Sequence, residues 1–377
     1  MAAAPTIFLS AGEPSGDLHG AAVARALRRR WPDARLLGLA GPRMQAAGVE
    51  PIAPFDRLAV MGFAEVVRHL PFFVGLMTRV VRTLREERVE LVIPIDYPGF
   101  NLRLASRASK RRIPVLYYIA PQVWAWHRSR AGKLAATADR LAVILPFEEE
   151  VFAAHGANVR FVGHPLVDRP EPTVDRDAFC EPMGLDPGRR ILAVFPGSRA
   201  QELHRHLEPF IDAARRVVEA RWHVQPVVAR STDVPEATYE GCPFPVTPDG
   251  PSLLAHAHAA LVKSGTSTLE TALAGVPMVI AYRAHPATFW LARRLVDVEH
   301  IGLVNLVAGR RVAPELLQEE ATPGALAEAL LPLIDEGPAR QAAVEGVRTV
   351  RRALERHDGA SPAEAVGELA AELLEGP

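Results

Sequence analysis

The chain has 377 residues, of which 49% are hydrophobic, and its formal net charge at pH 7 is −1. This length predicts two domains, and the near-zero charge excludes a general electrostatic attraction to nucleic acid or to an anionic membrane. Its two cysteines, Cys180 and Cys242, lie outside any zinc or redox motif, so we expect reduced thiols. Neither a secretory signal nor a run of about 20 uncharged apolar residues is evident, which predicts a cytoplasmic location.

The first half of the chain alternates short apolar runs with helical periodicity. Strands are predicted at Thr6–Ser10, Arg35–Ala40, Leu91–Ile95, Val115–Ile119 and Leu141–Leu145, and helices at Leu18–Arg30 and 62–85. Several of these strands are apolar on both faces. They therefore predict a parallel sheet that is covered by helices on both sides.

A break follows, and then the same alternation resumes. Five prolines between His164 and Arg190 predict a linker at 165–190. Further strands are predicted at Ile191–Phe195, Val224–Val228, Ala259–Val262 and Pro277–Ala281, and helices from Pro323 to Leu374. The predicted fold class is α/β, with two doubly wound Rossmann-like domains (1–164 and 191–377) facing across a cleft and a helical C-terminal tail.

The first strand runs into a glycine-containing turn, Ala11 to Asp17, before a helix. Its glycines allow a tight turn and a close approach to a ligand, and the helix start favours negative charge. We therefore place Glu13, Ser15 and Asp17 among the residues that line a cleft. The alternative is a plain strand-to-helix turn in which Ser15 or Asp17 caps the helix.

The strand Leu91–Ile95 ends in Asp96, and Pro98 stiffens the turn after it. A carboxylate at the carboxyl end of an inner strand is well placed to act as a general base, which makes Asp96 the candidate catalytic residue. A helix cap is the alternative role, and Asn101 is available for capping as well as for lining the cleft.

A polar segment with two tryptophans follows the next predicted strand. Gln122, Trp124 and Trp126 stand where they could line a sugar or acyl pocket. The tryptophans would serve equally well as anchors in the core, and the pattern alone does not separate these roles.

In the second half, a Gly-Ser turn with Ser198 and Arg199 opens a helix after Phe195. Backbone N–H groups, the helix dipole and a guanidinium together suit a diphosphate. Ser198 as a simple N-cap is the alternative, but it leaves Arg199 unexplained.

A second such turn follows the strand Ala259–Val262. Gly265 and Thr266 open a helix that carries Glu270 in its first turn, so the helix start would hold phosphate and the carboxylate would hold ribose hydroxyls. A capping box between Ser267 and Glu270 is the competing explanation.

No metal site is expected. His204 with His206, and His256 with His258, lie two residues apart and would not share one helix face. Neither a pair of carboxylates at a strand end nor the glycine fingerprint of a dinucleotide site is present, so we expect no metal and no cofactor.

Nine segments occur in an order that resembles the lipid-A-disaccharide synthase family. They are Ala11–Asp17, Val60–Glu65, Asp96–Asn101, Pro121–Trp126, Gly163–Pro165, Pro196–Arg199, Ser264–Glu270, Pro286–Leu295 and Asn305–Gly309. The resemblance covers the chain from about Thr6 to Leu330. It implies a glycosyltransferase-B fold and transfer of a diacylated glucosamine from UDP to an acylated glucosamine phosphate acceptor.

The resemblance also implies roles for single residues. Arg199, Glu270 and Asn305 would bind the UDP part of the donor, and Ser198, Gly265 and Thr266 would face its phosphates. Asp96 would be the base. Many relatives carry a second acidic residue where this chain has Gly99, which weakens the assignment of Asp96 as a base that works alone.

If the substrate is acylated, a second role is predicted for the segment from Leu70 to Met77. Alone, its apolar pattern favours a core helix. With flanking arginines, Phe72, Phe73, Leu76 and Met77 would also suit a helix that contacts acyl chains at the inner-membrane surface. The predicted location is then cytoplasmic with peripheral association with the inner membrane.

Rival interpretations come from two classes of protein. One is another UDP-sugar glycosyltransferase or an epimerase with the same fold, and the other is a non-catalytic protein that binds a nucleotide sugar or a lipid. Asp96 together with Arg199 and Glu270 favours the enzyme. A homodimer is compatible with the sequence, and we expect no nucleic-acid partner.

Overall fold

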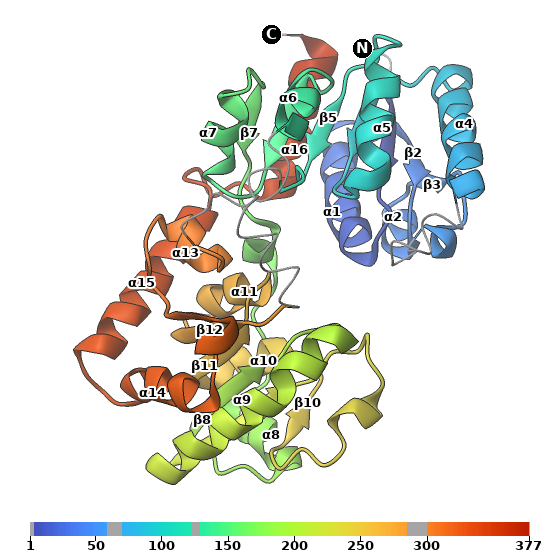
Figure 1. The fold of residues 1–377 in the computed structure, drawn as a ribbon. Coiled ribbons are helices and arrows are strands. Elements are labelled where there is room, and N and C mark those ends of the chain that lie inside the picture. The colour runs from blue at the N-terminus through green and yellow to red at the C-terminus, as the bar shows by residue number, and fades with distance from the viewer. Residues whose placement is uncertain (1–3, 59–69, 123–128, 285–299, 377) are drawn as a thin grey trace. The chain divides into compact units, whose positions relative to one another are not determined.

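The structure is a computed structural model that describes residues 4–58, 70–122, 129–284 and 300–376. The chain forms two compact units, which are shown in Figure 1. Unit 1 consists of Met1–Pro165 together with Arg356–Pro377, and unit 2 consists of Leu166–Glu355.

Unit 1 is built on parallel strands. Four of them form a sheet in the order β3-β2-β1-β4, with bounds β1 (Thr6–Ser10), β2 (Arg35–Leu39), β3 (Glu50–Pro51) and β4 (Leu91–Pro94). Three more, β5 (Leu116–Tyr118), β6 (Arg140–Val143) and β7 (Val159–Phe161), continue it, because parallel bridges join Val92 to Val115 and Ile95 to Tyr118. Short runs apolar on both faces thus form inner strands, as their pattern predicts.

Helices cover both faces of this sheet. On β1, Ile7 and Leu9 face one core and Phe8 faces the other, as the alternation of side chains along a strand requires. The first core is closed by α1 (Pro14–Arg30), α2 (Pro42–Ala46) and α16 (Pro362–Glu375). The second is closed by α4 (Leu70–Glu86), α5 (Pro98–Ser109), α6 (Ser129–Ala135) and α7 (Glu148–Ala153).

Unit 2 contains one parallel sheet in the order β10-β9-β8-β11-β12-β13. Its strands are β8 (Arg190–Phe195), β9 (Val224–Ala229), β10 (Val246–Thr247), β11 (Ala257–Lys263), β12 (Met278–Tyr282) and β13 (Glu315–Leu317). Helices α9 (Ala200–Ala220) and α14 (Pro323–Ile334) share a core with the sheet, and α10 (Gly250–His256) and α11 (Ser267–Leu273) also contact its strands. Two further helices, α13 (Leu303–Ala308) and α15 (Pro338–Leu354), pack against each other and against α11.

Both sheets have a doubly wound strand order. From one edge of the sheet to the other, the order of the strands in the sequence reverses once. The reversal falls between β1 and β4 in unit 1 and between β8 and β11 in unit 2. Doubly wound sheets bind ligands outside the carboxyl ends of the strands at such a point. The turns that carry Glu13, Asp96, Ser198 and Gly265 all follow one of these four strands. The prediction of two doubly wound Rossmann-like domains is confirmed.

The boundaries differ from those predicted. Residues 166–190 belong to unit 2, where Arg176 donates to the carbonyls of Pro187, Arg189 and His256, so this proline-rich segment is packed structure. Residues 356–377 belong to unit 1 instead of unit 2.

Helix α16 belongs to unit 1, where it contacts α1, β4 and β5 (Figure 1). Its apolar face is buried in the first core, where Val366 and Leu369 are fully inaccessible. Its acidic side chains pair with arginines of the same unit: Glu364 with Arg29, Glu375 with Arg30, and Glu372 with Arg140 and Arg160.

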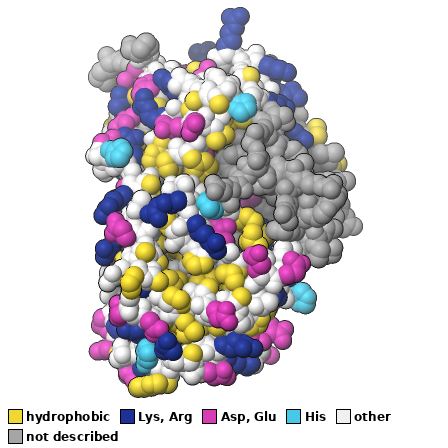
Figure 2. Space-filling view, turned by 60° about the vertical axis from the view of Figure 1, so that its left-hand side comes forward, with side chains coloured by type: hydrophobic (Ala, Val, Ile, Leu, Met, Phe, Trp, Pro, Cys, Tyr) yellow, Lys and Arg dark blue, Asp and Glu magenta, His cyan; other side chains and the backbone are white. Residues whose placement is uncertain are grey.

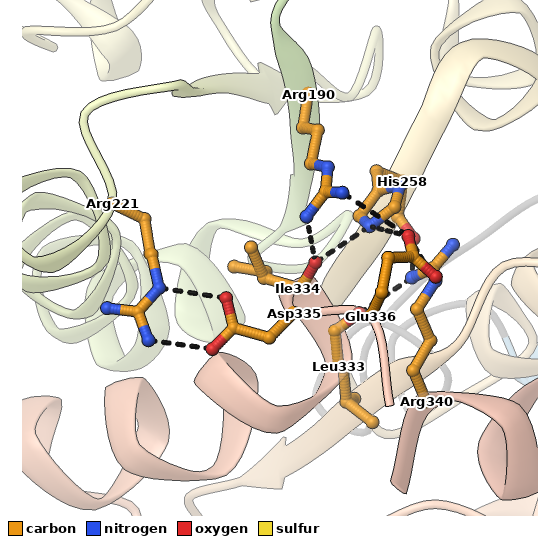
Figure 3. A network of polar contacts seen from close by, with 8 residues as sticks. All are labelled: Arg190, Arg221, His258, Leu333, Ile334, Asp335, Glu336 and Arg340. Atoms are coloured by element: carbon orange, nitrogen blue, oxygen red, sulfur yellow. Dashed lines mark hydrogen bonds and ion pairs between the residues drawn. The ribbon is translucent and has the colours of Figure 1, made fainter. Parts of the chain in front are cut away.

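A polar cluster closes the carboxyl end of α14 (Figure 3). The Ile334 carbonyl accepts hydrogen bonds from Arg190 and from Nε2 of His258, and the Leu333 carbonyl accepts one from Arg340 at 2.6 Å. Burial, and then the charge of Arg340, lowers the pKa of His258 to about 4, so its imidazole is neutral. The cluster satisfies carbonyls that a helix end leaves unpaired. It lies at the amino ends of β8 and β11, and its role is therefore structural.

The surface carries charges of both signs. On the face shown in Figure 2, basic and acidic side chains of the described residues are interspersed. In the part of the chain that the structure describes, no helix is long and apolar enough to cross a membrane.

Candidate functional site

The turn after β4 holds Asp96 in an unusual backbone conformation. Asp96 and Tyr97 have φ values of 47° and 51°, in the left-handed region that non-glycine residues seldom adopt. The Asp96 N–H donates to the Tyr118 carbonyl at 3.0 Å. The Asp96 carbonyl accepts from Nδ2 of Asn101 at 2.8 Å and from the Tyr117 hydroxyl at 3.0 Å. Strain of this kind persists only where surrounding contacts hold it, and it is common at functional sites.

The surroundings of Asp96 tune its carboxyl group. Burial, and then the negative charge of Glu13, raise the pKa of Asp96 to about 6, although the hydrogen bond from the Tyr97 backbone N–H partly offsets them. The same two causes, burial first and then Glu13, raise the pKa of Tyr97 to about 12. Asp96 is therefore ionised at neutral pH and is a stronger base than an ordinary aspartate.

Glu13 is the second carboxylate of this site. It lies in the turn after β1, and this turn packs closely on the turn after β4: a Cβ on Gly12 would lie only 2.3 Å from Cδ1 of Tyr97. Gly99 is exposed, with open space where its Cβ would be. Among the described residues, Glu13 therefore supplies the negative charge that acts on Asp96.

Two residues predicted to line the cleft instead hold the turns together. Asn101 is fully buried, accepts from the Ser10 hydroxyl at 2.6 Å, and donates to the carbonyls of Ser10, Ile95 and Asp96. Asp17 is 2% exposed, and its carboxylate accepts from the backbone N–H groups of Arg43 and Met44 at the start of α2. Their polar atoms are occupied within the chain, so the prediction that they line a cleft is wrong.

The other cleft-lining candidates of unit 1 divide into two groups. Glu13 and Ser15 are exposed at the start of α1, and Gln122 is exposed after β5. Trp124 and Trp126 lie outside the described residues.

The residues predicted to contact acyl chains pack in or against the second core of unit 1. Leu76 is 5% exposed and belongs to the second core of unit 1. Phe72, Phe73 and Met77 are half-buried against the same core. The assignment of Leu76 to a membrane contact is therefore wrong, because helical spacing turns this side chain inward.

In unit 2, the turn after β8 presents two of the predicted donor residues to solvent. Gly197 has φ +126°, and Ser198 and Arg199 are exposed ahead of α9. The Ser198 side chain forms no cap, so the simple N-cap alternative is not observed. Instead the Glu202 carboxylate accepts from the Ser198 backbone N–H at 3.0 Å.

The turn after β11 is tied to this first turn by an ion pair that the sequence analysis missed. Nζ of Lys263 lies 2.8 Å from Oε1 of Glu202, with both side chains largely buried. Burial opposes the ionisation of Glu202, but the hydrogen bond and charge of Lys263 outweigh it and lower its pKa. Lys263 also lies next to Gly265, which has φ +157°. One feature of the sequence could have identified Lys263: it is one of only three lysines in the chain, and it directly precedes Ser264.

Glu270 faces a pocket. It accepts a hydrogen bond from Arg169 at 2.6 Å, and no side chain caps α11 at Thr266, so the capping-box alternative is excluded. The pocket has a volume of about 390 Å³. Its walls are mainly apolar side chains of 166–172, α10 and α11, with Arg169, Glu171, Glu270 and Arg351 as charged groups.

Asn305 has no polar atom free for a ligand. It is fully buried, accepts from the N–H groups of Val312 and Ala313, and donates to the Ala313 carbonyl and to Glu315. Its contact with UDP therefore stays a prediction. In this structure it secures the segment between α13 and β13.

The described parts of both units contain no group of three or more His, Cys, Asp or Glu side chains placed to hold a metal ion.

Comparison with known proteins gives a consistent result over the whole chain. The family model for lipid-A-disaccharide synthetase matches residues 7–368. A lipid-A-disaccharide synthase of Acidobacterium capsulatum is 40% identical over 392 residues, with 100% of this chain and 98% of that protein covered. One from Coxiella burnetii is also 40% identical, with 94% and 96% covered.

Solved structures with low sequence identity share the fold. A UDP-N-acetylglucosamine 2-epimerase from Listeria monocytogenes, itself described as putative, matches with a TM-score of 0.66 at 13% identity, covering 98% of this chain and 96% of that one. MurG of Acinetobacter baumannii matches with a TM-score of 0.57 at 16% identity, covering 99% and 100%. These similarities concern the glycosyltransferase-B architecture alone.

Proposed function

Because the chain belongs to the lipid-A-disaccharide synthase family, we propose that it transfers 2,3-diacylglucosamine from UDP-2,3-diacylglucosamine to 2,3-diacylglucosamine 1-phosphate. The products are the disaccharide 1-phosphate and UDP. One observation carries the proposal on this chain's own residues: Asp96 is held in a left-handed turn at the carboxyl end of β4, and burial raises its pKa to about 6.

In the proposed reaction Asp96 is the general base. It takes the proton of the acceptor hydroxyl as that oxygen attacks the anomeric carbon of the donor, and the bond from this carbon to the UDP oxygen breaks on the opposite side. The displacement inverts the anomeric configuration. A pKa near 6 keeps the carboxylate ionised at neutral pH while making it a better proton acceptor than an exposed aspartate.

Unit 2 would bind the donor. Arg199 is exposed beside the Gly-Ser turn and would neutralise charge on the diphosphate, with Ser198, Gly265 and Thr266 at the neighbouring helix starts. Glu270 would accept hydrogen bonds from the ribose in place of the bond that it now receives from Arg169. No step of this scheme requires a metal ion.

We also propose that unit 1 contacts the inner-membrane surface, where an acylated acceptor resides. The exposed side of α4 supports this idea: Val74 is 60% exposed, and Arg79, Arg82 and Arg85 are exposed on the same helix. Arginines and an apolar side chain together suit anionic lipid. Val74→Asp should reduce sedimentation with vesicles that contain anionic lipid, and unchanged sedimentation would count against this contact.

The function is tested by incubating the protein with both acylated substrates in the presence of EDTA and following the disaccharide and UDP. We expect product despite chelation, and a large fall in the rate of product formation in Asp96→Ala with UDP binding retained. Full activity of Asp96→Ala would exclude Asp96 as the base. Absence of product from the unaltered protein, together with intact UDP binding, would mean that the acceptor is wrong.

A further inference from the structure

The hydroxyl group of Tyr117 is a second anchor of the catalytic turn. Tyr117 lies on β5, is fully buried in the second core of unit 1, and donates to the Asp96 carbonyl at 3.0 Å. The adjacent residue on β5, Tyr118, accepts the Asp96 N–H at 3.0 Å. Both backbone polar groups of Asp96 are thus bound by consecutive residues of one strand.

A tyrosine at this buried position needs a reason. Phenylalanine would fill the same apolar space without removing a hydroxyl group from water. The hydroxyl hydrogen bond that the structure records for Tyr117 goes to a residue whose φ is 47°. This conformation is disfavoured for any residue with a Cβ, so contacts that hold it are needed if the turn is to persist.

Asn101 also donates to the Asp96 carbonyl, but it bonds to Ser10 and Ile95 as well. Loss of Asn101 would disturb the ends of both β1 and β4 at once. Loss of the Tyr117 hydroxyl would remove a single bond to Asp96, which makes this hydroxyl the sharper probe of the turn.

We propose that Tyr117 is a positioning residue, whose hydroxyl acts through the Asp96 carbonyl to keep the left-handed turn and so to keep the carboxylate aimed at the acceptor. This inference rests on the proposed function, in which Asp96 is the base. Burial, followed by the charge of Asp96, raises the pKa of Tyr117 well above its ordinary value, so the hydroxyl stays a donor throughout the working pH range.

The inference predicts a change in pH dependence as well as in rate. Among the described residues, Glu13 of the β1–α1 turn and Tyr117 of β5 interact with the Asp96 charge, and Tyr97 contributes its backbone N–H. A relaxed turn would let water reach the carboxylate. Its pKa would then fall toward that of an ordinary aspartate, and the acid limb of the rate profile would move to lower pH.

The test compares Tyr117→Phe with a matched control, Tyr239→Phe. Tyr239 lies in unit 2, is 5% exposed, and its hydroxyl accepts the Ser231 N–H at 3.1 Å, so it too loses one buried hydroxyl bond to the backbone. For Tyr117→Phe we expect kcat to fall roughly 5- to 50-fold, KM for both substrates to change less than about twofold, and the acid limb to move to lower pH. Tyr239→Phe should keep the kcat and the acid limb of the unaltered protein.

A double variant separates positioning from simple destabilisation. In an Asp96→Ala background, Tyr117→Phe should leave the residual rate unchanged, because the residue through which it acts is gone. A further fall by the same factor would overturn the proposal, as would a Tyr117→Phe variant with unaltered kcat and acid limb. If Asp96→Ala keeps the full rate, the base assignment itself fails, and this inference fails with it.

Discussion

Replacing Glu13 by glutamine removes a negative charge near Asp96 and leaves the size of the side chain almost unchanged. Glu13 is exposed in the turn after β1, and its charge is the second cause, after burial, of the raised pKa of Asp96. Without that charge, ionised Asp96 becomes less unfavourable. We therefore expect the pKa of Asp96 to fall in the Glu13→Gln variant and its carboxylate to survive to lower pH.

The size of the effect in the unaltered protein follows from the pKa. With a value of about 6, only about a tenth of Asp96 is ionised at pH 5, so kcat/KM should be about tenfold below its plateau. An aspartate with the ordinary value of 3.8 would be almost fully ionised at that pH. For the Glu13→Gln variant, the ratio of kcat/KM at pH 5 to its plateau value should lie between these limits. The variant should therefore keep a larger share of its plateau value at pH 5 than the unaltered protein does.

The assay measures kcat/KM for disaccharide formation from pH 4.5 to 9 with both proteins. The phosphate group of the acceptor itself loses a proton near pH 6. This ionisation is common to both proteins, so the difference between the two profiles reports the enzyme. Glu240→Gln, at an exposed position of unit 2, is the control and should reproduce the original profile. Coincident acid limbs for Glu13→Gln and the unaltered protein would refute the argument.

Two further predictions concern stability and are checked by urea denaturation. Asn101→Ala should lower the free energy of unfolding by roughly 2 to 4 kcal/mol, because the Ser10 hydroxyl loses its buried acceptor and three carbonyls lose a donor. The control variant Gln122→Ala, at an exposed position, should change the free energy of unfolding little. Folding lowers the pKa of His258 to about 4. The stability that neutral His258 contributes to the fold is therefore complete above about pH 6.5 and is lost as the pH falls toward 4. His258→Gln, which keeps a donor for Ile334, should reduce the stability lost between pH 7 and 5 by roughly 1 to 2 kcal/mol, and an unchanged loss would contradict this account.

The sequence was sufficient for most of the strands and for the places where chemistry is concentrated, whereas β3, β7, β10 and β13 were not predicted. Thr6–Ser10 is β1 as predicted, and the predicted strand Leu91–Ile95 is one residue longer than β4 in the structure. Apolar runs identify inner strands because a parallel sheet buries both faces, and polar residues directly after such runs must lie at the carboxyl edge. Asp96, Ser198 and Gly265 were found in this way, and the structure places each in a turn at that edge.

What the sequence did not reveal is the direction in which each polar side chain turns. Asp17 meets the N–H groups of Arg43 and Met44, and Asn101 meets Ser10, which lies 91 residues earlier in the chain. Such partners are set by the packing of distant segments, and no local pattern encodes them. The same reason explains α16, whose apolar face matches α1 at the other end of the chain.

These misassignments share a physical cause that also bears on mechanism. A base at a strand end needs a fixed backbone, and the left-handed conformation of Asp96 is fixed by buried donors from α5 and β5. A family motif therefore contains two kinds of residue: those that face substrate and those that hold the turn, as Asn101 does. Replacing either kind is expected to lower activity, so a fall in activity alone does not separate them. Burial and occupied hydrogen-bonding atoms separate them, and the pH profile of Asp96 is the measurement that detects a turn that has lost its anchor.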